Sequence, residues 1–235
     1  MKIAGIRKTS LIDYPGKIST VIFTQGCNFC CPYCHNGELI PAESEEKEYM
    51  DSCIFLDFLD ERSQLLDGVV ITGGEPTLQP DLVEFISRIR EKDYQIKLDT
   101  NGSSFPVIEE LVESDLVDFL AVDIKGAPGN YDRYMALDSG PVLASVRDTV
   151  KLVLESNIEY ELRTTVVPGL HDREEIKNIA NFISGAEQFV IQNFRPDTTF
   201  DSRFEDKTRF PDDVLEDFRQ AAREVLSGAR IEIRD

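Results

Sequence analysis

The chain has 235 residues, of which 41% are hydrophobic and 29% are charged, so it can bury the core of one globular domain. Its formal net charge of −19 argues against general binding of nucleic acids or anionic membranes, because both would repel it. No apolar stretch approaches the ~20 residues of a membrane span and no signal peptide is visible, so we expect a single cytoplasmic domain over residues 1–235.

Strand and helix patterns alternate along the chain. Short apolar, β-branched stretches predict buried strands at residues 18–24, 68–72, 95–99, 118–124, 159–167 and 188–194. Apolar residues at helical spacing predict helices at residues 52–66, 81–92, 105–113, 141–156, 172–184 and 211–227, and a short apolar stretch follows at 231–233.

This alternation predicts right-handed βαβ units around a parallel sheet, and therefore an α/β fold. Six or seven units are too few for a closed eight-stranded barrel, so we expect a partial (β/α)6 barrel. A flat, doubly wound sheet is the alternative.

Polar and glycine-rich motifs follow the predicted strands. The cysteine-rich stretch comes after the first strand, and it is followed in later loops by TGGEP (72–76), DTNG (99–102), DIK (123–125) and RPD (195–197). Because parallel β/α proteins build their chemistry at the carboxyl ends of the strands, we expect these motifs to share one rim.

Four of the five cysteines lie within QGCNFCCPYCHNG, residues 25–37, and this crowding favours metal ligation in a reducing compartment over disulfides. They form either a C-x3-C-x2-C triplet (Cys27, Cys31, Cys34) or two adjoining C-x2-C pairs. Adjacent cysteines tend to point apart, and four-cysteine zinc sites usually draw their pairs from separated segments, so the triplet is favoured. Three thiolates on a [4Fe–4S] cluster leave one iron free for another ligand. Cys30 is then expected to be a small buried residue and Cys53 to belong to a helix core.

With Tyr33 before its last cysteine, the triplet is the signature of the radical S-adenosylmethionine (SAM) enzymes, which this chain resembles. Within them it resembles the activating enzymes of glycyl radical enzymes. The segment 8–40 is most similar to activators of anaerobic ribonucleoside-triphosphate reductase, and the resemblance extends from about Ile6 to Pro196. The motifs that recur in the same order in pyruvate formate-lyase activating enzymes are YCHN (33–36), GGEP (73–76), LDTNG (98–102), VDIK (122–125) and VVPG (166–169).

The resemblance implies a [4Fe–4S] cluster on the cysteine triplet, with SAM chelating the free iron. Gly73 and Gly74 would let backbone carbonyls approach SAM, and Glu75 would fix their loop. The complete set of residues that the resemblance places near SAM is Tyr33, His35, Gly73, Gly74, Glu75, Asn101, Asp123, Lys125 and Arg163. Without the resemblance, GGEP would be a strand-to-helix turn and Arg163 a structural arginine.

The resemblance also implies a monovalent-cation site formed by Asp99, Thr100 and Asp123, although a salt bridge on the rim is the simpler alternative. His35 is expected to order the cysteine loop near SAM. His171 is expected to be a surface or capping residue.

One stretch departs from the pyruvate formate-lyase activators. They carry a histidine after the sixth strand, whereas this chain has IQNFRPDTTF (191–200). The departure favours the activators of the reductase, in which a QFRP-like segment occupies this place. Gln192, Asn193 and Arg195 therefore become candidate site residues without an assigned role.

The expected function is reductive cleavage of SAM, followed by formation of a glycyl radical on a partner enzyme. The expected partner is anaerobic ribonucleoside-triphosphate reductase, with flavodoxin or ferredoxin as the electron donor. One alternative is a radical SAM enzyme that acts on a small molecule, similar to 7-carboxy-7-deazaguanine synthase. The other is a non-catalytic iron–sulfur electron-transfer module.

Overall fold

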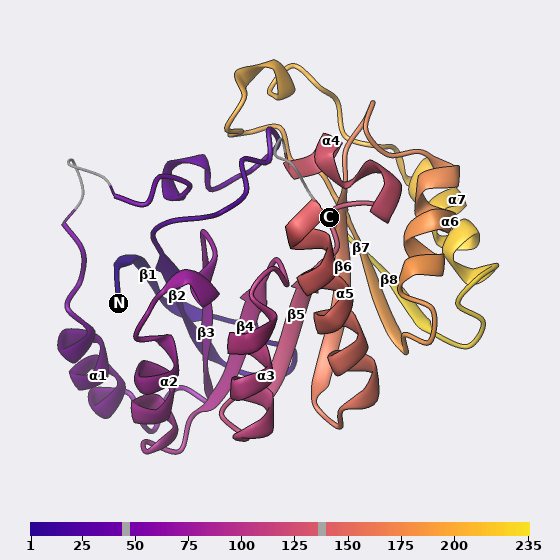
Figure 1. Ribbon diagram of the computed structural model, residues 1–235. Coiled ribbons are helices and arrows are strands. Elements are labelled where there is room, and N and C mark those ends of the chain that lie inside the picture. Colours follow the sequence, from indigo (N-terminus) through magenta and orange to yellow (C-terminus); the bar gives the residue numbers. More distant parts are fainter. Residues whose placement is uncertain (44–47, 136–139) are drawn as a thin grey trace.

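One sheet of eight strands lies at the centre of residues 1–43, 48–135 and 140–235, the part of the chain that the computed structural model describes (Figure 1). The strands follow one another across the sheet in chain order. They are β1 (Ile3–Ser10), β2 (Ser19–Thr24), β3 (Gly68–Gly73), β4 (Gln95–Thr100), β5 (Phe119–Asp123), β6 (Glu159–Val166), β7 (Gln188–Asn193) and β8 (Arg230–Arg234).

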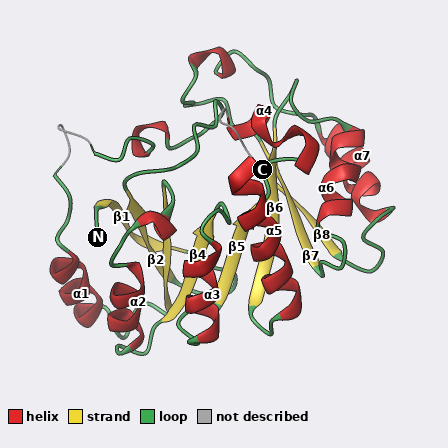
Figure 2. Cartoon of the chain, in the orientation of Figure 1, coloured by secondary structure: helices red, strands yellow, loops and turns green. Residues whose placement is uncertain are grey.

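The strands β2 to β8 are parallel, and only β1 runs antiparallel to its neighbour β2. A strand order that never reverses, joined by right-handed crossovers, places all the connecting helices on one face of the sheet. Figures 1 and 2 show this arrangement, with the helices along one side of a curved sheet. The fold is thus a partial barrel, as predicted, and the doubly wound alternative is wrong.

The helices of the described residues mostly match the predicted ranges. They are α1 (Ser52–Glu61), α2 (Leu82–Arg90), α3 (Phe105–Glu113), α4 (Tyr131–Met135), α5 (Gly140–Glu155), α6 (Arg173–Phe182) and α7 (Asp212–Arg223). Side-chain caps begin two of them: Asp51 accepts a hydrogen bond from the N–H of Cys53, and Asp172 accepts one from the N–H of Glu175. Short 3-10 turns lie at Gly37–Leu39, Pro76–Leu78, Pro128–Asn130 and Ser202–Phe204.

Three elements differ most from the prediction, and one of them, the short helix α4, was not predicted at all. β1 was not predicted, because IAGIRKTS has neither an apolar run nor a regular alternation. α1 ends at Glu61 rather than at residue 66, since the chain turns at residues 62–65 to enter β3.

The two faces of the sheet carry different residues. Ile22, Ile71 and Leu98 are fully buried and belong to the large core between the sheet and the helices. Their neighbours Val21 and Val70 point to the concave face, because side chains alternate along a strand. There they join Tyr14, Phe119 and Ala121 in a small apolar cluster, and charged residues occupy other positions of the concave face.

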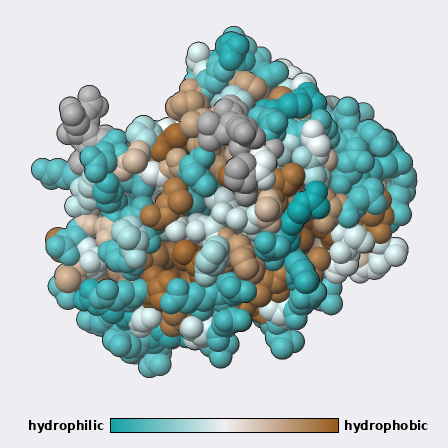
Figure 3. Space-filling view, viewed as in Figure 1, coloured by the Kyte–Doolittle hydropathy of each residue, from teal (hydrophilic) through white to brown (hydrophobic). Residues whose placement is uncertain are grey.

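The face shown in Figure 3 is mixed: hydrophilic side chains predominate, and hydrophobic ones appear among them near the centre of the view. On this face, hydrophilic side chains cover most of the helices. Within the described parts of the chain, no helix has the length and apolar character needed to cross a membrane.

Candidate functional site

A cavity of about 380 Å³ opens at the carboxyl ends of the parallel strands. Every residue that the sequence analysis placed in a site lines it. These residues are Cys27, Cys31, Tyr33, Cys34, His35, Gly73, Gly74, Glu75, Asp99, Thr100, Asn101, Asp123, Lys125, Arg163, Gln192, Asn193 and Arg195. Cys30 and Cys53 are not among the lining residues.

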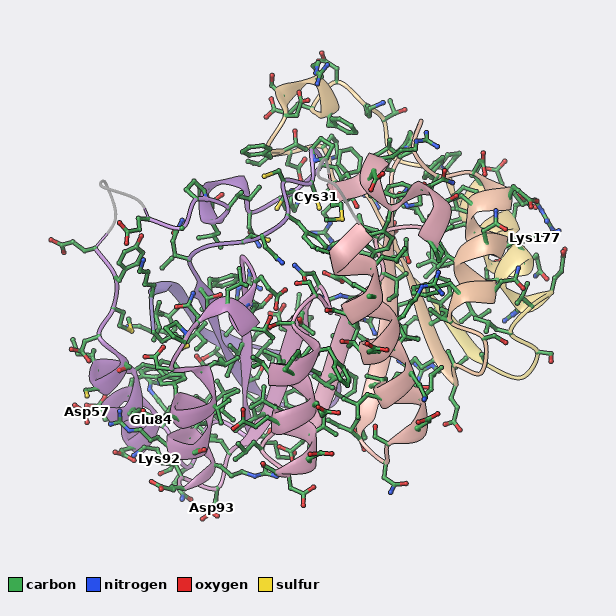
Figure 4. All side chains as sticks on the ribbon, viewed as in Figure 1. Cys31, Asp57, Glu84, Lys92, Asp93 and Lys177 are labelled. Atoms are coloured by element: carbon green, nitrogen blue, oxygen red, sulfur yellow. The ribbon has the colours of Figure 1, made fainter. Side chains whose placement is uncertain are left out.

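The cysteine loop after β2 is closed by backbone hydrogen bonds. The N–H of Cys27 donates to the carbonyl of Ile40 over 3.0 Å, and the N–H of Cys34 donates to the carbonyl of Cys31 over 3.0 Å. The N–H of Cys30 instead donates to the carbonyl of Met135 in α4, 3.1 Å away. The loop thus brings three of its four thiols to the cavity, and Figure 4 shows Cys31 above the upper end of the sheet.

Of these three cysteines, Cys31 is buried, and Cys27 and Cys34 are half-buried. Burial raises the pKa of Cys27 to about 11 and that of Cys31 to about 12, and it also raises the pKa of Cys34. The positive charge of Lys125 lowers the pKa of all three. Metal binding must therefore displace their protons, and Lys125 is placed to favour the thiolates.

The glycines of GGEP pack against the chain that leads into the cysteine loop. Gly73 has a φ of +125°, and a Cβ there would lie 2.2 Å from the amide nitrogen of Thr24. A Cβ on Gly74 would lie 2.2 Å from the carbonyl oxygen of Gly26, next to Cys27. From the sequence, the expected close neighbour of these glycines is SAM. The structure shows that the backbone of the neighbouring segment is also too close to leave room for a side chain at either position.

Glu75 ties the end of β3 to the end of β4. It is 1% exposed, and its Oε1 accepts hydrogen bonds from the hydroxyls of Thr77 and Thr100 at 2.6 and 2.7 Å. Its Oε2 accepts a hydrogen bond from the N–H of Asn101 at 2.7 Å. Burial raises the pKa of Glu75 above its usual value, although these hydrogen bonds act against the shift. Both carboxylate oxygens are thus engaged in fixing the loops.

A chain of alternating charges crosses the concave face below the cysteines. Arg163 lies between two carboxylates: its Nε donates to Asp123, and its Nη1 lies 3.1 Å from Asp99 Oδ2. Lys125 pairs with Asp123 over 3.1 Å. Burial raises the pKa of Asp123, but Arg163 and Lys125 lower it, and the net result is well below the usual range. Asp123 is therefore ionised at all ordinary pH values.

The predicted monovalent-cation site coincides with this chain of charges. Asp99 and Asp123 are both paired with Arg163, and the hydroxyl of Thr100 donates to Glu75. Cation binding at these residues stays a prediction.

Lys97 does not line the cavity, but it pairs with Asp99, which does, and the sequence analysis did not single it out. It is 2% exposed, pairs with Asp99 and lies over the ring of Phe119. A lysine at the centre of the predicted apolar strand QIKLD was the available signal, because buried lysines are rare unless paired.

The stretch that follows β7, residues 195–210, covers the cysteine loop in Figure 1. The N–H groups of Phe200 and Asp201 donate to the carbonyls of Cys34 and Pro32 at 3.0 and 2.9 Å. The Nδ1–H of His35 donates to the carbonyl of Thr198 over 2.7 Å. The covering segment (residues 195–210) therefore holds the loop in place through its backbone.

Three expectations outside the cavity were wrong or only partly right. His171 is buried rather than exposed: its Nδ1 accepts from the N–H of Val167, and its Nε2–H donates to the carbonyl of Lys125. Cys53 is exposed rather than part of a helix core, because it lies on the outer side of the first turn of α1. Cys30 is half-buried.

The comparison with known families agrees with this geometry. The model of the radical SAM superfamily matches residues 21–183, which include the cysteine loop, GGEP and the charged rim. The chain belongs to the radical SAM superfamily. The cofactors of this superfamily are a [4Fe–4S] cluster and SAM.

Among individual relatives, two of the similar proteins are activating enzymes by name. A candidate glycyl-radical enzyme activating enzyme of Methanocaldococcus jannaschii is 34% identical over 232 residues, which cover 97% of this chain and 95% of that protein. A pyruvate formate-lyase-activating enzyme of Clostridium pasteurianum is 31% identical over 192 residues, covering 77% and 76% of the two chains.

Solved structures support the fold. SuiB of Streptococcus suis, bound to its precursor peptide SuiA, superposes with a TM-score of 0.70 at 15% identity over 92% of this chain. The chain spans about half the length of SuiB, since the match covers 48% of that protein. At this identity the likeness concerns the fold alone.

The residues of this radical SAM chain fit a [4Fe–4S] cluster better than a single metal ion. Among the described residues, no three Cys, His, Asp or Glu side chains converge as a single ion would require. Three thiols instead surround one cavity, and a cubane cluster binds each thiolate at a different iron.

Proposed function

We propose that this protein generates a glycyl radical on anaerobic ribonucleoside-triphosphate reductase, with flavodoxin or ferredoxin as the electron donor. Cys27, Cys31 and Cys34 would hold the cluster, because they are the three cysteines that line the cavity. When bound, the cluster and SAM supply the reductive cleavage of SAM that yields a 5′-deoxyadenosyl radical.

The chain's own residues hold and orient these groups. Lys125 compensates the negative charge of the thiolates, since its own charge lowers the pKa of all three cysteines. Gly73 and Gly74 keep the end of β3 close to the cysteine loop, and Glu75 fixes that end against the neighbouring turn. Asp123 and Arg163 present paired charges to the cavity, which suits the amino and carboxylate groups of SAM.

The observation that carries the choice of partner is the cavity wall formed by the end of β7 and the residues that follow it. There Gln192, Asn193 and Arg195 line the cavity, and this wall has no histidine. This composition resembles the activators of the reductase and differs from the pyruvate formate-lyase activators.

The open barrel also supports a protein substrate. A primary alkyl radical is unselective, so selectivity must come from holding one C–H bond beside it. Among the described strands, β1 and β8 do not pair, so the barrel stays open on one side. An open side admits a peptide loop more readily than it encloses a small molecule.

The test uses anaerobically reconstituted protein, SAM, a reductant and the cognate reductase. We expect the glycyl doublet in the electron paramagnetic resonance spectrum, and we expect its loss when the radical glycine of the reductase is replaced by alanine. A doublet on pyruvate formate-lyase but not on the reductase would contradict the choice of partner. Absence of any doublet, together with faster SAM cleavage in the presence of a small molecule, would contradict glycyl radical formation.

A further inference from the structure

The last strand of the sheet brings an arginine to the concave face. β8 lies beside β7 at the edge of the sheet (Figure 1), beyond residues 21–183 of the family match. Arg234 is in register with Gln192, which lines the cavity, so both point to the inside of the barrel.

Arg234 makes a two-pronged ion pair with Glu161 of β6. Its Nη1 lies 3.0 Å from Oε1, and its Nη2 lies 2.7 Å from Oε2. The side chain of Glu161 is only 1% exposed, whereas that of Arg234 is 32% exposed. The pair therefore gives both oxygens of a buried carboxylate a charged donor, the geometry in which such a pair is strongest.

Glu161 is also close to Arg163. The Nη1 of Arg163 is 3.6 Å from Glu161 Oε1 and 3.1 Å from Asp99 Oδ2. One guanidinium group thus lies within reach of two competing carboxylates. With Arg234 in place, Glu161 is already paired, and Arg163 stays with Asp99 and Asp123 at the cavity.

Loss of Arg234 would change this competition. A buried carboxylate without its partner is costly, and the nearest remaining guanidinium belongs to Arg163. Arg163 would turn toward Glu161 and away from Asp99. The negative charges of Asp99 and Asp123 at the cavity would then be less fully balanced by its guanidinium group.

We propose that Arg234 is a positioning residue for the SAM cavity: by pairing with Glu161, it keeps Arg163 between Asp99 and Asp123. The proposal rests on the proposed function only in taking this cavity as the SAM site.

The test compares four variants by calorimetric SAM binding to the cluster-loaded protein. Arg234→Met should weaken SAM binding by about tenfold or more, a loss of about 1.4 kcal/mol or more. The double variant Arg234→Met/Glu161→Gln should bind SAM within about threefold of wild type, because the competing charge is gone. Glu161→Gln alone should behave like wild type.

Arg230→Met is the matched control. Arg230 lies on the same strand, is 73% exposed and pairs with Glu232, which also pairs with Arg234. Its replacement should leave SAM binding unchanged. If the double variant binds SAM as weakly as Arg234→Met, or if Arg234→Met binds like wild type, the proposal is overturned.

A crystal structure of Arg234→Met without SAM gives a readout that does not depend on the proposed function. The guanidinium of Arg163 should lie against Glu161. An unmoved Arg163 would overturn the inference even if wild type binds SAM, whereas a failure of wild type to bind SAM would count against the proposed function alone. If Arg234→Met does not fold, the double variant must still fold and keep Arg163 at Asp99, or the proposal fails.

Discussion

Cys30 and Cys31 are neighbours in the chain, yet only Cys31 lines the cavity. Adjacent side chains point apart, and the N–H of Cys30 is engaged by Met135 in α4. The spacing alone left two groupings of the four cysteines open. The tertiary position of each thiol favours the triplet.

We predict that Cys27→Ala, Cys31→Ala and Cys34→Ala each abolish the reconstituted cluster, because each removes one of three thiolate ligands. Cys30→Ala and Cys53→Ala should retain it. Iron and sulfide contents, with ultraviolet–visible spectra of the anaerobic proteins, measure the effect. A cluster lost in Cys30→Ala but kept in Cys31→Ala would contradict the grouping.

At Gly74, the absence of a Cβ atom lets the end of β3 pack against the backbone of the cysteine loop. We predict that Gly74→Ala lowers the free energy of unfolding by about 1–3 kcal/mol, since its Cβ would overlap the carbonyl of Gly26. Because Gly26 precedes Cys27, the variant should also take up less iron. Urea denaturation of the metal-free protein and an iron assay check both effects.

Gly129 provides the matched control for this substitution. A Cβ there would meet no atom within 4 Å, so Gly129→Ala should change neither stability nor iron content. Full stability and full iron content in Gly74→Ala would show that the cysteine loop does not depend on this contact.

At the scale of elements, the start of α6 supports the loop that follows β5. His171 precedes α6 and donates a hydrogen bond to the carbonyl of Lys125, and its ring lies 4.6 Å from that of Tyr134. Glu175 in the first turns of α6 accepts hydrogen bonds from the N–H of Ala127 and the side chain of Asn130. The helix thereby helps to place Lys125 beside the thiols.

We predict that this support weakens in acid. Burial lowers the pKa of His171 from 6.5 to about 4, so the unfolded chain takes up the proton first as the pH falls. Stability is therefore fully present above pH 6.5 and is lost as the pH falls toward about 4, by about 3 kcal/mol in total.

Urea denaturation of wild type and His171→Gln at several pH values measures this effect. Because other groups titrate in both proteins, the difference between the two curves isolates His171. The difference should change between pH 6.5 and about 4 and remain constant above. Two parallel curves would contradict the role given to His171.

Elements with a regular pattern were predicted well, and the others were not. Parallel strands such as β2 and β3 were recognised because they are short apolar runs between polar loops. β1 was missed, since its residues are half-buried or exposed over most of its length and it forms an edge of the sheet. The extended conformation of such a strand is stabilised by its pairing with β2 and is not indicated by its own composition.

At the scale of the whole molecule, the open sheet separates two environments. The face toward the helices is apolar, whereas the concave face carries Lys97, Glu161 and Arg234 in addition to the cavity residues. Burying charges is tolerable only when each finds a partner, and here they alternate in sign across several strands. Lys97 is the one lysine or arginine in the buried class among the described residues, and it lies in this region although the chain has a net charge of −19.

Several features could be predicted from the sequence: the α/β class, the order of the parallel strands and of the long helices between them, the cysteine spacing and the motifs that share the rim. These features follow from local periodicity and from the rule that parallel strands end at the same edge. The tertiary structure alone decided which charges pair, that His171 is buried, and that the covering segment lies on the cysteine loop. Glu161 and Arg234 are 73 positions apart, and His35 and Thr198 are 163 apart. No local pattern encodes such contacts, because they exist only once the sheet has brought distant strands together.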